Sequence, residues 1–384
     1  MIAFTSKILY TPVEQIQRPV VLIEHGSIVN LGPRDGFELP QAIQSLDFGE
    51  CVIAPGMLDI HVHGGAGHDV MRADEGGREK FERFLTRHGV TSYFPTTVAA
   101  PLDATLTALE HLADTIEFAD GDGRACPLGI HLEGPFLSHA RRGVHLPEDL
   151  LVPDVATFER FWQAARGQIR IMTIAPELEN AIEVISQAVQ RGVCVSLGHS
   201  DADLGRSRDA IGTGARHATH TFNAMRPLDH RRPGLLAEIL TNGNVTADVI
   251  ADGIHVDPTM VQLLFKIKGP EKLVLITDAI SAAGMPDGTY ALGSLEVEVK
   301  DGRCTLNGTL AGSTLTLDSA LRNLMQFGHC DLQQSLRTAT LNPARVAGAP
   351  KKGVLEPGAD ADLVVLSPDG QVVATVIKGI VVQQ

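Results

Sequence analysis

Buried-strand and helix patterns alternate along residues 54–350, and this alternation restricts the fold more than any other feature of the sequence. Several candidate strands are nearly continuous apolar runs, as expected for parallel strands that are covered on both faces. The eight candidates are 57–63, 91–97, 127–133, 169–176, 193–199, 217–222, 246–251 and 272–278. Eight strand-plus-helix units predict a (β/α)8 barrel, the TIM-like fold of the α/β class.

The segments between these strands carry helical periodicity. Residues 103–118 place leucine and isoleucine three or four positions apart after Asp103, a candidate N-cap. Residues 180–190 repeat this pattern and stop before Gly192. A doubly wound α/β sheet is the competing architecture, but no GxGxxG motif follows the first strand, which disfavours it.

The two ends of the chain differ from the middle, because both read as short β-strands. Residues 19–31 predict one hairpin, and residues 362–377 predict another around a Pro-Asp-Gly turn. Neither end can bury a core alone. Since chain termini often lie close together, we expect the ends to pair into one small β-sandwich. The expected divisions are 1–53 and 351–384 for the sandwich and 54–350 for the barrel.

One segment interrupts the alternation after the last barrel strand. Residues 284–310 contain turn signals at Pro-Asp-Gly (286–288) and Asp-Gly (301–302), which flank an alternating strand pattern at 295–299. This arrangement predicts a β-hairpin inserted into the barrel.

Composition limits the classes of partner. The chain has 384 residues, 44% of them hydrophobic and 20% charged, which predicts an ordinary globular protein with an ample core. Its 32 basic and 46 acidic residues give a net charge of −14, which argues against nucleic acid or a membrane as the main partner. A local cluster of arginine and histidine can still hold an anionic substrate. Five cysteines without a CxxC pair, no signal-peptide pattern and no apolar run of ~18 residues predict a cytoplasmic location.

Ionisable residues recur at the carboxyl ends of the candidate strands, where the active site of a barrel lies. The first strand ends at His61 and His63, which are two apart, share one face and form half of a metal site. Later strand ends supply Glu133, His199, His217 or His220, and Asp278. A carboxylate with several imidazoles and an open position suits a catalytic Zn2+ or Fe2+ ion.

Spacing distinguishes between neighbouring candidates. Three-residue spacing puts His217 and His220 on opposite faces of a strand, and we favour His220 because it is nearer the strand end. His131 lies two residues before Glu133, so it points inward one layer deeper, where an orienting hydrogen bond is expected in place of ligation. Two loop histidines are expected to overhang the mouth of the barrel, namely His145 and His255.

Several of these residues occur in longer motifs. The HxH pair, the histidines of the fifth and sixth strands and Asp278 resemble the amidohydrolase superfamily. The longer motifs narrow the resemblance to the N-acetylglucosamine-6-phosphate deacetylase family, and it covers nearly the whole chain in order. These motifs are HLEGPF (131–136), GHS (198–200), FNAM (222–225), ADGIH (251–255), TDA (277–279) and AGSTL (311–315).

The resemblance implies roles for individual residues. It implies a metal site of three residues, Glu133, His199 and His220, with Asp278 as the catalytic carboxylate. It places His145 near the acetyl carbonyl of the substrate. The residues implied to hold the sugar phosphate are Asn223, the backbone around Ala224, Arg231 and His255. Family members differ at the HxH motif, so His61 and His63 leave open either one or two ions per subunit.

The activity that the resemblance implies is hydrolysis of the N-acetyl group of N-acetylglucosamine 6-phosphate to glucosamine 6-phosphate and acetate, in amino-sugar catabolism and cell-wall sugar recycling. Asp278 would deprotonate the attacking water, and His145 with the metal would polarise the carbonyl. A homodimer or homotetramer is implied, with Arg231 serving its own or a neighbouring subunit. Two alternatives stay open, namely deacetylation of N-acetylgalactosamine 6-phosphate and a non-catalytic sugar-phosphate sensor.

Overall fold

The centre of the molecule is built from parallel strands. A computed structural model describes residues 1–37, 43–72, 74–119 and 123–382 of the chain. One sheet has six strands in the order β13 (Ile130–Glu133), β14 (Ile169–Ile174), β15 (Cys194–Leu197), β16 (His217–Ala218), β17 (Thr246–Ile250) and β18 (Leu273–Ile276). A second sheet has the order β12 (Cys126–Pro127), β11 (Val90–Pro95) and β8 (Met57–Val62). All neighbours within both sheets are parallel.

Two isolated bridges connect the two parallel sheets. Thr96, just after β11, forms a parallel bridge with His131 of β13. Val62 of β8 forms another with Ala279, just after β18. The eight predicted strands of the middle segment each overlap a strand of these sheets, so the chain is an α/β protein with a parallel core.

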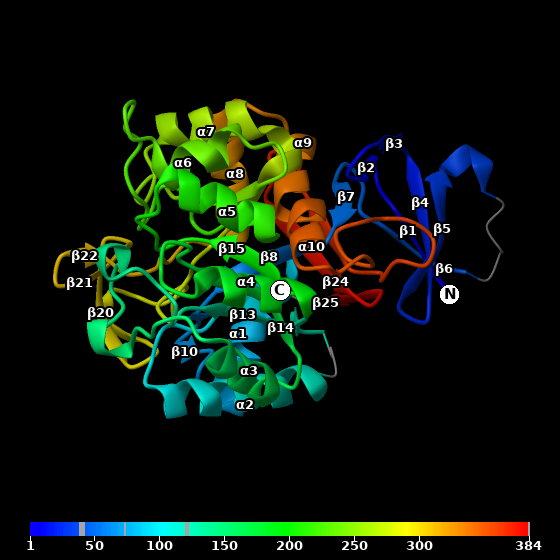
Figure 1. The fold of residues 1–384 in the computed structure, drawn as a ribbon. Helices are drawn as coiled ribbons and strands as arrows, with labels where there is room; N and C mark the ends of the chain where they lie inside the picture. The colour runs from blue at the N-terminus through cyan, green and yellow to red at the C-terminus, as the bar shows by residue number, and fades with distance from the viewer. Residues whose placement is uncertain (38–42, 73, 120–122, 383–384) are drawn as a thin grey trace.

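Helices surround these strands (Figure 1). They are α1 (Glu75–Arg87), α2 (Leu102–Glu117), α3 (Val155–Ala164), α4 (Ala181–Gln190), α5 (Leu204–Thr213), α6 (Gly234–Thr241), α7 (Pro258–Lys272), α8 (Leu317–Gly328), α9 (Leu332–Ala339) and α10 (Leu341–Val346). Both predicted helix patterns are present, as α2 and α4. The predicted N-cap Asp103 is wrong, because Pro101 occupies that position and Asp103 lies in the first helical turn. A carboxylate there still favours the helix, since it faces the positive end of the helix dipole.

Strands from both ends of the chain share one sheet. Its order is β25 (Ile380–Val382), β24 (Val372–Ile377), β23 (Leu363–Leu366), β7 (Val52–Pro55), β2 (Ile8–Tyr10) and β3 (Gln15–Gln17). A four-stranded sheet has the order β5 (Ser27–Pro33), β4 (Pro19–Glu24), β1 (Ile2–Thr5) and β6 (Gln44–Asp47). The two predicted hairpins are confirmed as β4–β5 and β23–β24. Buried residues of both sheets, including Phe4, Val21, Ile53 and Val365, pack into one cluster.

The segment inserted after β18 is larger than the predicted hairpin. It forms a four-stranded antiparallel sheet of β19 (Gly288–Leu292), β20 (Leu295–Lys300), β21 (Arg303–Leu306) and β22 (Thr309–Leu310). The turn between β21 and β22 is Asn307-Gly308, where φ is 51° and 80°. Asn-Gly favours a two-residue hairpin turn because both residues tolerate positive φ, so this dipeptide is the signal that would have extended the prediction.

The insert packs against the parallel core. Its Leu292 and Val297 lie in a buried cluster with Val98 and Ile280. In Figure 1 the insert lies on one side of the molecule, and the sheet containing β1 and β4 lies on the other. A short two-stranded ribbon of β9 (Gly64–Gly65) and β10 (His68–Asp69) follows β8.

Two further predictions concern membrane-spanning segments and the state of the cysteines. None of the described helices is both long and apolar enough to cross a membrane. The five cysteines all lie in the described part of the chain, and each is a free thiol.

Candidate metal centre and active site

A cavity of about 370 Å³ lies at the carboxyl ends of the parallel strands. This is the end of such sheets where ligands bind, because the loops that follow the strands meet there. Seven of its lining residues are ionisable and were predicted from the strand ends and loops. They are His63, Glu133, His145, His199, His220, His255 and Asp278.

Three of these residues have an uncommon backbone conformation immediately after their strands. The φ angles of His199, His220 and Asp278 are 46°, 30° and 51°. Positive φ costs free energy in residues with a side chain, and such strain collects at functional sites. The turn ends each strand early, which is why β16 has only two residues, and it allows the side chains to converge.

Glu133, His199 and His220 form a tight group. The Nε2 atom of His220 lies 3.1 Å from Oε1 of Glu133 and 2.9 Å from Nε2 of His199. The Nε2 atom of His199 is 3.3 Å from the same carboxylate oxygen. On its other side, His199 donates from Nδ1 to the carbonyl oxygen of Arg141 at 3.0 Å. This hydrogen bond leaves the lone pair of Nε2 facing the group.

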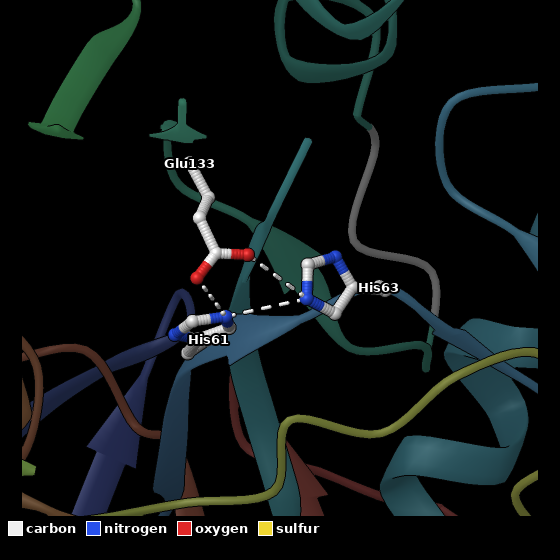
Figure 2. Close-up of side chains that lie close together, drawn as sticks. All are labelled: His61, His63 and Glu133. Atoms are coloured by element: carbon white, nitrogen blue, oxygen red, sulfur yellow. Dashed lines mark hydrogen bonds and ion pairs between the residues drawn. The ribbon is translucent and has the colours of Figure 1, made fainter. Parts of the chain in front are cut away.

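The HxH pair also contacts the carboxylate of Glu133 (Figure 2). The Nε2 atoms of His61 and His63 are 3.2 Å apart, and each is 3.5 Å from a Glu133 carboxylate oxygen. His63 donates from Nδ1 to the carbonyl oxygen of Thr96 at 3.0 Å, so its Nε2 lone pair also faces inward. Glu133 therefore contacts both groups of histidines, as expected for a bridging carboxylate.

The donor set fits a divalent metal ion. One atom from each of His61, His63 and Glu133 lies within 4.8 Å of the other two, and the same holds for Glu133, His145 and His199. Imidazole lone pairs about 3 Å apart repel unless a proton or a cation lies between them. Imidazoles with a carboxylate are the ligands of zinc and of non-haem iron.

Asp278 is buried beside the HxH pair and is held as a carboxylate. Its Oδ1 atom lies 3.0 Å from Nε2 of His63 and 3.5 Å from Nε2 of His61. Burial raises the pKa of Asp278, but its contacts with His63 and His61 outweigh this effect and lower the pKa to about 2. Burial also opposes ionisation of Glu133, yet its histidine neighbours lower the pKa of that carboxyl well below its usual value. Both carboxylates are therefore ionised at neutral pH.

His145 is buried and uncharged. Burial, together with nearby His199, lowers the pKa of His145 to about 3. The backbone N–H of Ala99 donates to its Nδ1 atom at 3.2 Å, so the proton of the neutral ring is on Nε2. His145 can therefore donate a hydrogen bond from Nε2 without carrying a charge.

The two alternative histidines lie outside this cluster. His131 contacts the carbonyl oxygen of Ile60 at 2.9 Å and Oγ1 of Thr173 at 2.8 Å, one layer below Glu133. His217 is 3.2 Å from Oδ2 of Asp248 and 2.7 Å from Oγ1 of Thr246. The structure thus places His220 in the cluster and gives His131 a hydrogen-bonded position behind it.

The predicted substrate-binding residues divide into two groups. Asn223, Ala224 and His255 line the cavity, and His255 is fixed by its Nδ1 atom, 2.7 Å from Oδ2 of Asp252. Arg231 is exposed and is not among the described residues that line the cavity of its own chain. The backbone N–H of Arg231 donates to Oδ1 of Asp229 at 2.8 Å, within a surface turn.

Sequence reasoning missed part of the cavity wall. The insert contributes Leu292, Leu295, Thr309 and Leu310, and the loop after β13 contributes Arg141. The Asn307-Gly308 turn could have indicated the second half of the insert. Arg141 and Arg142 form a basic pair in the sequence, but nothing local shows that the Arg141 side chain reaches the cavity.

Comparisons with known proteins identify the family. The chain matches the model described as "Amidohydrolase family" over residues 52–382. It is 39% identical to N-acetylglucosamine-6-phosphate deacetylase of Bos taurus, over 89% of this chain and 86% of that protein. It is 38% identical to N-acetylgalactosamine-6-phosphate deacetylase of Escherichia coli O157:H7, over 82% and 83%.

Solved structures agree with the sequence relatives. A structure of N-acetyl-D-glucosamine-6-phosphate deacetylase from Mycobacterium smegmatis, in complex with N-acetyl-D-glucosamine-6-phosphate, superposes with a TM-score of 0.93 at 34% identity. The superposition covers 100% of this chain and 99% of that one. The chain therefore belongs to the amidohydrolase family, in the group of the N-acetylglucosamine-6-phosphate deacetylases.

Proposed function

We propose that the chain hydrolyses the N-acetyl group of N-acetylglucosamine 6-phosphate, releasing acetate and glucosamine 6-phosphate. The observation that carries this proposal is the convergence of Asp278 with Glu133 and the histidines in one cavity, in a chain that is similar to deacetylases over most of its length. The reaction would belong to amino-sugar catabolism in the cytoplasm, where free thiols such as those of this chain are stable.

Glu133, His199 and His220 would hold one divalent metal ion, Zn2+ or Fe2+, and His61 with His63 would provide a second, weaker position. Such an ion lowers the pKa of a coordinated water towards neutrality. The short contacts of Glu133 with both groups of histidines support its assignment as the shared ligand.

Two further residues would move and hold protons. Asp278, ionised in its buried position, would accept a proton from the attacking water and deliver it to the leaving amine. His145 would donate from Nε2 to the acetyl carbonyl oxygen as that oxygen gains negative charge. A neutral donor suits this position because His199 and the proposed metal lie next to it.

The HxH pair can be tested separately from the main site. Replacing His61 and His63 together by alanine is expected to lower metal content towards one ion per chain and to leave measurable acetate release. The reason is that Glu133, His199 and His220 keep their mutual contacts without the pair. Metal analysis beside an acetate assay checks this, and loss of all metal and all activity would contradict it.

The sugar phosphate would be held by Asn223, the backbone at Ala224, His255 and Arg231. Because Arg231 is exposed and outside its own cavity, we propose that it reaches the cavity of a neighbouring subunit in a homodimer or homotetramer. Arg231→Ala should then raise KM for the phosphorylated sugar roughly 10- to 150-fold, because a hydrogen bond to a charged group contributes about 1.5–3 kcal/mol.

Mixing variants tests this sharing of residues between subunits. Arg231→Ala subunits have intact chemistry, whereas Asp278→Asn subunits keep Arg231 but lack the proposed base. In a mixed pair, the site of the Arg231→Ala subunit receives Arg231 from the Asp278→Asn subunit and is therefore complete. Co-refolded mixtures should show a KM near the wild-type value, with activity from only a fraction of the sites. Activity equal to the sum of the two separate variants would show that Arg231 serves its own subunit.

The substrate is tested directly by metal analysis of the purified protein and acetate release from N-acetylglucosamine 6-phosphate. N-Acetylgalactosamine 6-phosphate should be assayed beside it, because the relative from Escherichia coli O157:H7 is named for that sugar. A higher kcat/KM for the galactosamine epimer would favour that second candidate. No acetate from either sugar, in metal-depleted and metal-restored protein, would indicate a sensor without catalytic activity.

We also propose the finer architecture. The bridges from β11 to β13 and from β8 to the residue after β18 support closure of the parallel strands into one (β/α)8 barrel over residues 54–350. The shared cluster of Phe4, Ile53 and Val365 supports a β-sandwich made from residues 1–53 and 351–384.

A further inference from the structure

A phosphate ester is bound most strongly where a cationic side chain can donate hydrogen bonds to its oxygens. The chain carries a net charge of −14, and the cavity contains the ionised carboxylates Glu133 and Asp278. Arg231 does not line this cavity. Among the described residues that do, Arg141 is the only lysine or arginine.

The side chain of Arg141 is anchored at one nitrogen and open at the others. Arg141 ends the short 3-10 turn His139–Arg141 that follows β13. Its Nε atom donates to Oδ1 of Asp201 at 2.9 Å, and the described residues provide no other partner for its guanidinium. The remaining N–H groups of a guanidinium form a planar fork that matches two phosphate oxygens.

Asp201 is hydrogen-bonded to a second arginine, so it can orient the guanidinium of Arg141. Its Oδ2 atom accepts from Nη2 of Arg226 at 2.8 Å, while its Oδ1 atom accepts from Nε of Arg141 at 2.9 Å. The carboxylate therefore joins two arginines from different loops. One of its oxygens faces each arginine, so the Arg141 side chain is positioned before any substrate binds.

The same contacts place Arg141 beside the loop assigned to the sugar phosphate. The backbone N–H of Ser200 donates to the carbonyl oxygen of Ala224 at 3.0 Å, and that of Arg226 donates back to Ser200. Asp201 thus follows a residue that is hydrogen-bonded to the Ala224 loop. Through its hydrogen bonds with Arg226 and Arg141, Asp201 links that loop to Arg141.

We propose that Arg141, oriented by Asp201, binds the substrate phosphate within its own subunit. This inference rests on the proposed function and adds a phosphate-binding residue to it. The backbone of Arg141 has a different task, because its carbonyl oxygen accepts from Nδ1 of His199. Side-chain substitution leaves this carbonyl in place, so phosphate binding and metal binding can be separated.

The test compares two arginines of the same network. Arg141→Gln is expected to raise KM for N-acetylglucosamine 6-phosphate about 10- to 100-fold, the effect of losing a hydrogen bond to a charged group. Metal content and the weak turnover of unphosphorylated N-acetylglucosamine should stay near wild type. Arg226→Gln is the matched control, because Arg226 also binds Asp201 and is equally exposed, 30% against 33%, but does not line the cavity.

Four outcomes decide the proposal. The proposal is supported if KM rises only in Arg141→Gln and only for the phosphorylated sugar. Arg141→Lys should then bring KM part of the way back to the wild-type value. Equal losses on both sugars, equal KM effects in Arg226→Gln, or loss of metal in Arg141→Gln would each overturn it in favour of a structural role for the network.

Inorganic phosphate separates this inference from the proposed function. The metal-loaded wild-type protein should bind phosphate measurably by calorimetry, and Arg141→Gln should bind it at least about tenfold more weakly. This measurement needs no turnover. A wild-type protein that binds phosphate through Arg141 but releases no acetate would refute the function and leave the site standing, whereas unchanged phosphate affinity in Arg141→Gln would refute the site.

Discussion

Asp278→Asn is expected to retain its metal and to lose turnover by about 10²–10⁴-fold, the usual contribution of a general acid–base group. The amide has nearly the same shape as the carboxylate, but it cannot accept the proton of the attacking water. Asp278 is buried, lies 3.0 Å from Nε2 of His63 and has a pKa of about 2, so it is the ionised base throughout the neutral range. Single-turnover acetate release beside metal analysis measures both quantities.

The pH dependence of turnover provides a second test of the role of Asp278. Because the pKa of Asp278 lies far below neutrality, its replacement should lower turnover by a similar factor at every pH from 6 to 9 and should not shift the profile. Near-normal turnover in Asp278→Asn would show that another group is the base. His145 is then the residue to replace next, since it is the neutral imidazole at the same cavity.

Glu133→Ala is expected to lose the metal as well as the activity. Its carboxylate lies within 3.5 Å of Nε2 atoms of His61, His63, His199 and His220. Removing it leaves both groups of histidines without their shared anion. Loss of a residue that only orients a ligand costs about 10–100-fold in metal affinity, so a direct ligand should cost more.

A second variant separates metal loss from misfolding. Glu133→Gln keeps the volume of the side chain and removes its charge, so the fold should survive while metal affinity still falls. Circular dichroism, thermal unfolding and metal titration on both variants check this. A Glu133→Gln protein that binds metal with wild-type affinity would remove Glu133 from the ligand set.

The parallel core was predictable because its pattern is local. Strands that are covered on both faces are continuous apolar runs, and the helices between them repeat every three or four residues, so each element is visible within its own segment. The strand limits were less predictable. The prediction carried the sixth strand to residue 222, whereas β16 ends at Ala218 because the chain turns towards positive φ at His220.

The insert contains a local turn signal, Asn307-Gly308, that the predicted hairpin did not include. The prediction took the turns at 286–288 and 301–302 and stopped at a hairpin. The Asn307-Gly308 turn adds a further strand pair, and together the four strands supply one wall of the cavity. The sequence contained this turn, but contact of Leu292 and Leu310 with the cavity depends on how the insert packs onto Val98 and Ile280.

By itself, the sequence determined the residue types at the strand ends, and with them the metal-binding chemistry of Glu133 and the histidines. It did so because strand ends are set by local periodicity and their side chains meet wherever parallel strands run together. Only the tertiary structure decided which arginine faces the cavity. Arg141 and Arg231 both lie in basic loops, but Arg141 is turned inward by Asp201, 60 residues away in the chain, whereas Arg231 is held in a surface turn by Asp229. Contacts between distant residues leave no periodic trace in a sequence, and this is why the cation of the cavity could not be chosen from the sequence alone.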